Sequence, residues 1–174
     1  MSATTLNTLI TTYLEMTSPQ QLQASLHKAD NVRVELMRDV DVAFYRKMYR
    51  AVGEKWRWRD RLIMPREELR NILERDTTRV YVLYVDNDPA GYVELDQQGA
   101  STEIAYFGLR EAYHGRGLGK FLLSFGIKEA WDLGAERVFV HTCNLDGPHA
   151  LSNYRKRGFA VYQETREPMP ELYA

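Results

Sequence analysis

The ten residues from 113 to 122 constrain this chain more than any other segment, because they hold three glycines and two cations. They separate a strand-like run (residues 103–109) from an amphipathic helical run (residues 118–133). Glycine lets the main chain approach a ligand closely, and a helix N-terminus presents unpaired N–H groups and partial positive charge. With the cations Arg116 and Lys120, this pattern predicts a seat for a diphosphate. A glycine-rich strand-to-helix turn without a ligand is the structural alternative.

Two common phosphate loops are excluded by the spacing. A Walker A loop needs Gly-x-x-x-x-Gly-Lys-Ser/Thr, but Phe121 follows Lys120 and His114 stands five positions before Gly119, so no hydroxyl is placed for magnesium. A dinucleotide fingerprint needs Gly-x-Gly-x-x-Gly, and the two possible alignments end at Lys120 and Leu122 instead of glycine.

The loop His114-Gly115-Arg116-Gly117-Leu118-Gly119 resembles the pyrophosphate loop of the GNAT superfamily of acyl-coenzyme A N-acyltransferases, whose pattern is Arg/Gln-x-x-Gly-x-Gly/Ala. One position departs, since His114 stands where that family has Arg or Gln. The resemblance continues in register from about Val80 to Val161. It implies acetyl-CoA as the co-substrate, held by these six residues and Lys120, and acetyl transfer to an amine.

Composition sets the class of protein. With 174 residues, 44% apolar and 27% charged, we expect one globular domain with a sizeable core. The 23 Lys and Arg nearly balance the 24 Asp and Glu, which argues against a nucleic-acid or membrane partner. No apolar run approaches 18 residues and no leader pattern is present, so a cytoplasmic location is expected. The single Cys143 fits a reducing compartment, and no cluster has metal-ligand spacing, so no metal is expected.

The hydrophobic periodicity predicts an α/β (α+β) fold. Residues 1–30 are expected to form a helical extension, because Leu6, Leu9, Ile10, Tyr13 and Leu14 recur at helical spacing and Ser18 to Gln21 reads as a helix start. Residues 31–174 are expected to form the GNAT domain, a mixed and mainly antiparallel sheet flanked by helices. The strands are expected at 31–37, 79–85, 90–95, 102–109, 137–142 and 159–164, and the helices at 42–52, 65–74, 118–133 and between Pro148 and Gly158.

By the same resemblance, Phe107, Gly108 and Leu109 lie where the family's strand separates from its neighbour and holds the pantetheine arm. Their backbone groups are expected to bond the arm, with one N–H near Leu109 directed at the thioester oxygen. A glycine bulge in a crowded strand explains Gly108 equally. Asn144, at the end of the following strand, is expected to bond the pantetheine amide.

Glu103 resembles the strand-borne glutamate that deprotonates the acceptor in some members of the family. If the hairpin turns at Gln98-Gly99, or symmetrically over four residues, Glu94 falls opposite Glu103 on the same face. Two carboxylates so close oppose joint ionisation and raise one pKa. A three-residue loop abolishes the pairing, and two solvent-facing glutamates are the structural alternative. His141 is interpreted as an ordinary strand residue.

The segment from Asn144 to Phe159 resembles the family's Asn-x(n)-Ala-x-x-x-Tyr-x-x-x-Gly-Phe pattern. The resemblance gives Tyr154 the role of the acid that protonates the departing thiolate. A phenol is neutral at pH 7 and therefore in the right form to donate. A tyrosine packed on the sheet is the alternative for Tyr154, and Phe159 is interpreted as a core residue.

By the same resemblance, the acceptor site is expected at residues 44–75, and with Glu94 its candidate binding residues are Tyr49, Trp56 and Trp58. The tryptophans either clamp an aromatic or cationic amine or close the sheet. The acidic glutamates favour a small cationic primary amine, although polyamine, aminoglycoside, lysine and protein N-terminus all fit. The rival functions are a silent acyl-CoA sensor and an interaction domain that uses residues 1–30, a segment that also suits homodimerisation.

Overall fold

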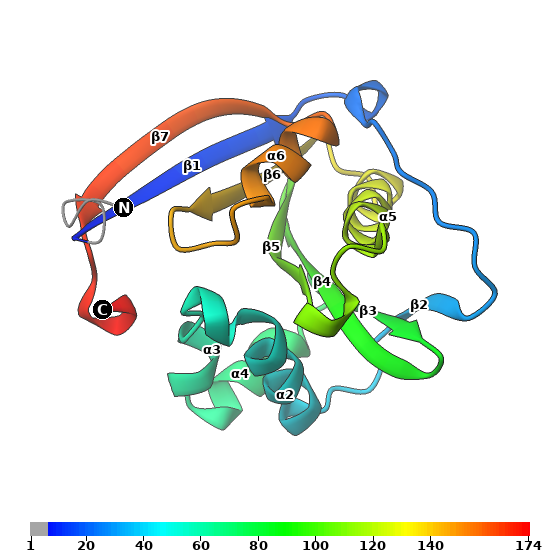
Figure 1. Cartoon of the computed structure of the whole chain (residues 1–174), viewed down its shortest axis with the longest axis horizontal. Helices are drawn as coiled ribbons and strands as arrows, with labels where there is room; N and C mark the ends of the chain where they lie inside the picture. The colour runs from blue at the N-terminus through cyan, green and yellow to red at the C-terminus, as the bar shows by residue number, and fades with distance from the viewer. Residues whose placement is uncertain (1–6) are drawn as a thin grey trace.

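A seven-stranded mixed sheet organises the computed structural model, which describes residues 7–174 (Figure 1). The strand order is β2-β3-β4-β5-β6-β1-β7, and neighbours pair antiparallel except β5 and β6, which are parallel. The strands are β1 (Thr8–Met16), β2 (Val32–Leu36), β3 (Thr78–Val85), β4 (Asp88–Gln98), β5 (Ser101–Leu109), β6 (Arg137–Cys143) and β7 (Ala160–Pro168). The predicted mixed, mainly antiparallel sheet is confirmed, with strands one to four residues longer than expected at several ends.

Helices cover both faces of the sheet (Figure 1). One face packs against α5 (Leu118–Asp132) and α6 (Ala150–Lys156), and the other against α2 (Val42–Gly53) and α4 (Arg66–Leu73). The short helix α3 (Asp60–Ile63) belongs to the segment that joins α2 to α4. Two apolar clusters result, one under α5 that includes Leu122 and Ile127, and one under α2 that includes Tyr45 and Tyr49. Within residues 7–174, no helix is long and apolar enough to cross a membrane.

The N-terminal helical extension is wrong for the described residues, because residues 8–16 form strand β1 inside the sheet. A bulge between Tyr13 and Leu14 shifts the pairing register with β7. The buried side chains are Leu9 and Thr11 before the bulge and Leu14 and Met16 after it. The alternation of buried and exposed residues therefore changes phase at the bulge. Such a change of phase gives a strand the apolar spacing of a helix. Leu6 lies outside the described residues.

The remainder of the expected extension is mostly without regular structure. The Ser18–Gln21 capping box is present, but it starts only the single turn η1 (Pro19–Gln21). Because β1 pairs with β6 on one side and β7 on the other, its edges are not available to a partner protein. The idea that residues 1–30 form a helical pairing arm therefore does not fit β1.

Candidate active site

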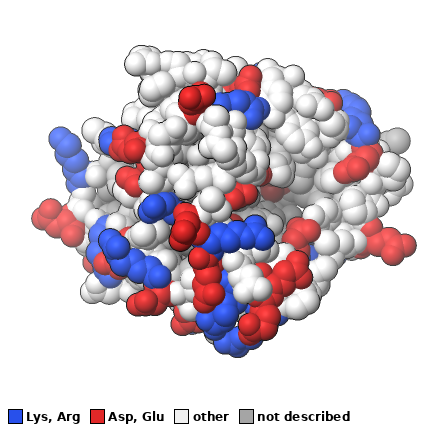
Figure 2. Space-filling model, turned by 180° about the vertical axis from the view of Figure 1, so that it is seen from behind, with Lys and Arg blue, Asp and Glu red and all other residues white. Residues whose placement is uncertain are grey.

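Strands β5 and β6 diverge and open a cleft in the middle of the sheet. They pair only from Ser101 to Glu103, where Glu103 lies opposite Phe139. Beyond this point β6 continues to pair with β1, whereas β5 keeps only β4 as its partner. The cleft has a volume of roughly 930 Å³, and it is bordered by β5, β6, the glycine-rich loop, α3 and the loop before α6. Figure 2 shows a hollow in one face of the molecule, above a lower half where charged side chains gather.

The glycine-rich loop forms one end of this cleft. Helix α5 begins after Gly117, which has φ +77° and supplies no side-chain cap, so the first N–H groups of the helix have no partner within it. Gly115 also has a positive φ, +76°, and open space where a Cβ would stand. Most of the predicted cofactor residues line the cleft, namely Phe107, Gly108, Leu109, His114, Gly115, Gly117, Gly119 and Lys120.

Two predicted cofactor residues of the loop point elsewhere. Arg116 donates from Nη2 to the carbonyl of Ala112 at 3.3 Å and lies over the ring of Tyr113. Leu118, the first residue of α5, is buried in the apolar core. Neither side chain is part of the cleft lining, so any contribution from these residues comes from the main chain.

The departure at His114 has a structural explanation. Its Nε2 lies 3.0 Å from the carbonyl oxygen of Leu109, so this nitrogen carries the proton and donates it. The bond joins the first residue of the glycine-rich loop to the last residue of β5. His114 therefore holds the loop against the strand, and the sequence pattern alone contained no signal for this contact.

Tyr154 lies at the other wall of the cleft, on α6, with only 7% of its surface exposed. Its ring packs edge-on against Phe107 and Phe159, with centroids 6.3 and 6.0 Å apart. Burial, and then the charge of Asp146, raises the pKa of the Tyr154 hydroxyl above its ordinary value. The hydroxyl is therefore neutral and holds its proton at physiological pH. Phe159 is buried, as expected for a core residue.

Asp146 is a cleft residue that the sequence analysis missed as a site residue. Its Oδ2 accepts from Thr142 Oγ1 at 2.6 Å and from the N–H of Cys143 at 3.0 Å, while Oδ1 accepts from Trp58 Nε1 at 3.4 Å. The carboxylate thus joins the end of β6 to the aromatic cluster on α2 and β5. Its position after the strand is readable from sequence, but its partner Trp58 is not, because 88 residues separate them.

Asn144 is engaged by β1. Its Oδ1 accepts from the N–H of Ile10 at 2.9 Å, and its Nδ2 donates to the carbonyl of Thr8 at 2.9 Å. The residue is not among those that line the cleft. Its binding of pantetheine therefore stays a prediction, with a competing structural role in the anchoring of β1.

The Glu94 carboxylate belongs to a buried network of hydrogen bonds with Tyr45 and Arg61. Its side chain is 1% exposed, accepts from the Tyr45 hydroxyl at 2.5 Å and pairs with Arg61 Nη2 at 2.9 Å. Burial raises the pKa of the Glu94 carboxyl, and Arg61 and Tyr45 oppose that rise. Since Arg61 balances its charge, Glu94 adds little to an acidic lining.

The partner of Glu103 differs from the predicted one. The hairpin turns at Gly99-Ala100, with Gln98 opposite Ser101, so Asp96 and not Glu94 lies opposite Glu103. Gln98 Nε2 donates to Glu103 Oε2 at 2.8 Å and to Asp96 Oδ2 at 3.0 Å. Burial raises the pKa of the Glu103 carboxyl and Asp96 adds to this, whereas His141, Gln98 and Arg61 lower it. The predicted Glu94–Glu103 pair is therefore wrong, and Asp96 is the carboxylate that lies opposite Glu103.

The predicted acceptor aromatics mainly hold elements together. Trp58 packs on Tyr49 and Tyr106, with centroids 5.5 and 5.3 Å away, and its ring occupies the space beside Gly53. Tyr49 is buried and not part of the cleft lining. Trp56 lines the cleft, and its ring lies against Gly147 in the loop before α6.

A C-terminal turn adds an unexpected wall to the acceptor end. In η4 (Glu171–Tyr173), the Tyr173 hydroxyl donates to the carboxylate of Asp60, at 2.9 Å from both oxygens. Arg57 and Arg59 bond the carbonyls of Tyr173 and Leu172, each at 2.7 Å. Both Tyr173 and Asp60 line the cleft. No local pattern predicts this contact, because its partners are more than a hundred residues apart.

This arrangement of divergent strands, glycine-rich loop and following helix defines the class of protein. A model of the Acetyltransferase (GNAT) family matches residues 39–159, which covers more than half of the chain, and the chain belongs to this family. The match includes β5, the loop and Tyr154, so the family resemblance expected from the loop is confirmed.

Individual relatives match over shorter stretches. A mycothiol acetyltransferase of Corynebacterium efficiens is 41% identical over 59 residues, which is 34% of this chain and 20% of the relative. The uncharacterized N-acetyltransferase YvbK of Bacillus subtilis is 33% identical over 82 residues, 47% of this chain and 52% of the relative. The chain thus spans between a fifth and about half of the length of these curated relatives.

Solved structures share the fold at low identity. A GCN5-related N-acetyltransferase from Kribbella flavida has a TM-score of 0.66 and 15% identity, over 94% of this chain and 60% of that one. A Bacillus subtilis acetyltransferase in complex with CoA has a TM-score of 0.59 and 23% identity, over 76% of this chain and 78% of that one. An aminoglycoside acetyltransferase from a soil metagenome, in complex with sisomicin, has a TM-score of 0.61 and 19% identity, over 74% and 88%.

Proposed function

We propose that the chain is an N-acetyltransferase that moves the acetyl group of acetyl-CoA directly to the primary amine of a small cationic acceptor. The observation that carries this proposal is the cleft between β5 and β6, which ends at the uncapped start of α5. One end offers main-chain N–H groups and Lys120 for a diphosphate, and the middle offers the free edge of β5. These features fit a long, thin ligand with phosphates at one end, such as coenzyme A.

The residues divide this work by position. The loop from His114 to Lys120 would hold the diphosphate, and the main chain of Phe107 to Leu109 would hold the pantetheine arm. When bound, acetyl-CoA supplies an activated acetyl thioester. Main-chain N–H groups cost no reorganisation when they stabilise developing negative charge, which suits them to the thioester oxygen.

Acetyl transfer to an ammonium moves two protons, one away from the acceptor and one to the departing thiolate. Glu103 and Tyr154 are the proposed groups for these two transfers. Glu103 would take a proton from the acceptor ammonium at its carboxylate, for which its burial and raised pKa suit it. Tyr154 keeps a proton at its hydroxyl, where a departing thiolate would need one. The two side chains both reach the cleft, from β5 and α6.

The acceptor end favours a cationic amine. The carboxylates of Asp60, Asp96 and Glu103 all line this end, and Arg61 is already paired with Glu94. The fold neighbour with sisomicin is an acetyltransferase of a polycationic acceptor, which supports this class without identifying the molecule. A silent acyl-CoA sensor on the same fold is the alternative.

The test is turnover of acetyl-CoA, measured as release of free thiol, with a panel of polyamines, aminoglycosides, lysine peptides and peptide N-termini. Wild type, Tyr154→Phe and Glu103→Gln are compared, and Tyr162→Phe and Glu164→Gln on the exposed strand β7 serve as matched controls. We expect turnover with a cationic amine, lost by about 100-fold or more in each site variant because a positioned acid or base is removed, and retained in both controls. Tight binding of acetyl-CoA without turnover on any amine would favour the sensor.

A further inference from the structure

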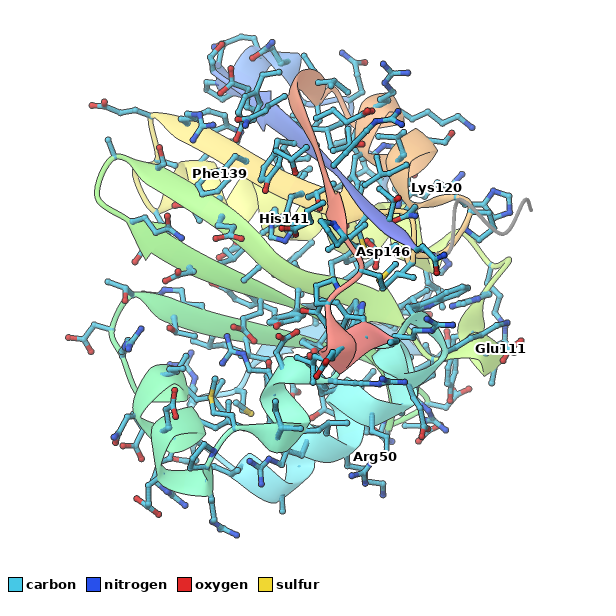
Figure 3. All side chains as sticks on the ribbon, turned by 90° about the vertical axis from the view of Figure 1, so that its left-hand side faces the viewer. Arg50, Glu111, Lys120, Phe139, His141 and Asp146 are labelled. Carbon is cyan, nitrogen blue, oxygen red and sulfur yellow. The ribbon has the colours of Figure 1, made fainter. Side chains whose placement is uncertain are left out.

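His141 lies beside the proposed base at the point where the sheet opens. Strand β6 places Phe139 opposite Glu103, and His141 follows two residues later on the same face. Its Nδ1 is 3.6 Å from Glu103 Oε1. From His141 the labelled side chains run past Asp146 toward Lys120 at the start of α5 (Figure 3). His141 is thus at the acceptor end of the cleft, which it also lines.

The two side chains differ in their access to water. The Glu103 side chain is 18% exposed, whereas that of His141 is 50% exposed. The ring of Tyr13 on β1 packs against the imidazole, with centroids 5.7 Å apart, and leaves half of the histidine in solvent. His141 therefore stands between a half-buried carboxyl and the bulk water.

The other groups that face Glu103 are unsuited to carry a proton away. From β4, Gln98 donates to Glu103 and does not titrate, and Asp96 is a second carboxylate across the strand pair. From α3, Arg61 is paired with Glu94 and stays protonated. Histidine is the side chain whose ordinary pKa lies near neutral pH, where a proton is both accepted and released readily.

We propose that His141 is a positioning residue that relays the acceptor's proton from Glu103 to solvent. This inference rests on the proposed function, because it gives the proton taken by Glu103 a path out. The acceptor ammonium gives one proton to the Glu103 carboxylate, and the resulting carboxyl gives it to Nδ1 of the neutral imidazole. The imidazolium then releases the proton on Nε2 to water. One proton crosses the site, no electrons are exchanged, and Glu103 returns to its carboxylate form. The half-exposed imidazole, left with its proton on Nδ1, returns to the Nε2–H tautomer by proton exchange with water.

The distance of 3.6 Å is longer than a hydrogen bond and short enough for an ion pair. A small rotation of the half-exposed ring, or one bridging water, joins the two groups. When the imidazole is protonated, its charge stabilises the Glu103 carboxylate and lowers the pKa of that carboxyl. Removal of His141 should therefore raise the pKa of Glu103.

The first experiment needs no turnover. The carboxyl of Glu103 is titrated by NMR in wild type and His141→Gln, with His27→Gln, which is not part of the cleft lining, as the matched control. We expect the Glu103 midpoint to move upward by about one pH unit in His141→Gln, the size typical of losing a nearby opposite charge, and to stay in place in the control. An unmoved midpoint in His141→Gln would overturn the coupling.

The second experiment separates the relay from the charge. His141→Lys keeps a cation near Glu103 but does not exchange its proton readily near neutral pH. With the best acceptor, we expect His141→Gln and His141→Lys both to lose about tenfold or more in kcat, with little change in KM, whereas only His141→Gln shifts the acidic limb of the pH profile upward. Full kcat in His141→Lys would show that charge alone suffices and would overturn the relay. Absence of turnover in wild type would instead refute the proposed function, and the relay with it.

Discussion

Gly108 lies where helix α2 packs against strand β5, and this packing explains why the residue is a glycine. A Cβ at this position would lie 2.5 Å from Cγ1 of Val52, which is buried in α2. The glycine is therefore required for close packing of the helix on β5. This contact supports the structural explanation, and it does not exclude the approach of a ligand to the other side of the strand.

We predict that Gly108→Ala destabilises the protein by about 1 to 3 kcal/mol, because an extra methyl group in a filled site forces its neighbours apart. Thermal or denaturant unfolding measures the change. Gly119→Ala is the comparison, since a Cβ there lies at an ordinary 3.7 Å from Leu109 Cδ1. Equal stability of wild type and Gly108→Ala would show that Val52 yields without cost.

At this scale, the sequence predicted the kinds of site residue better than their partners. The loop glycines, Glu103 and Tyr154 follow a local pattern, and the structure brings them to one cleft. The Arg61–Glu94 pair joins residues 33 positions apart, and the partner of Glu103 depends on whether the hairpin turns one residue earlier or later. A one-residue change of register exchanges the facing side chains, which composition does not determine.

At the scale of elements, β1 is the main correction. Its threonines and aromatic residue suit a strand, but the bulge at Tyr13 changes the phase of burial, so the apolar spacing resembled a helix. Elements with one uninterrupted period, such as α2 and α5, were predicted within a residue or two. Local periodicity therefore predicts an element only as long as nothing interrupts it.

Asn144 tests the anchoring of this element. We predict that Asn144→Ala lowers stability by about 1 kcal/mol, because it removes the side-chain hydrogen bonds to the N–H of Ile10 and the carbonyl of Thr8, which lie where water can reach them. Faster amide exchange at Ile10 would accompany the loss. A fall in coenzyme A affinity with unchanged stability and exchange would show instead that Asn144 acts on the pantetheine arm.

At the scale of the whole molecule, the sheet is continuous only because β1 joins β6 to β7. Both neighbours pair with β1, and the strand order places them on opposite sides of it. The β6 wall of the cleft is thus supported by β1, a strand that lies far earlier in the sequence (Figure 1).

We predict that the β1 amides that bond its neighbours exchange with solvent only through global unfolding, because two strands hold them. Native-state hydrogen exchange should give Leu14 an opening free energy equal to that of Leu95 in β4, and a lower value for the edge strand β2, which pairs only with β3. Rapid exchange throughout β1 would mean that the strand detaches by itself.

The place of β1 also sets the order in which the nascent chain folds. Translation produces this strand well before its two partners, which begin at Arg137 and Ala160. Until those residues leave the ribosome, Leu9, Leu14 and Met16 have no sheet to enter, and an unpaired apolar strand is prone to aggregation. Strand β1 must therefore wait for both of its later partners, and chains truncated or stalled before Ala160 should depend on chaperones more than chains that include β7.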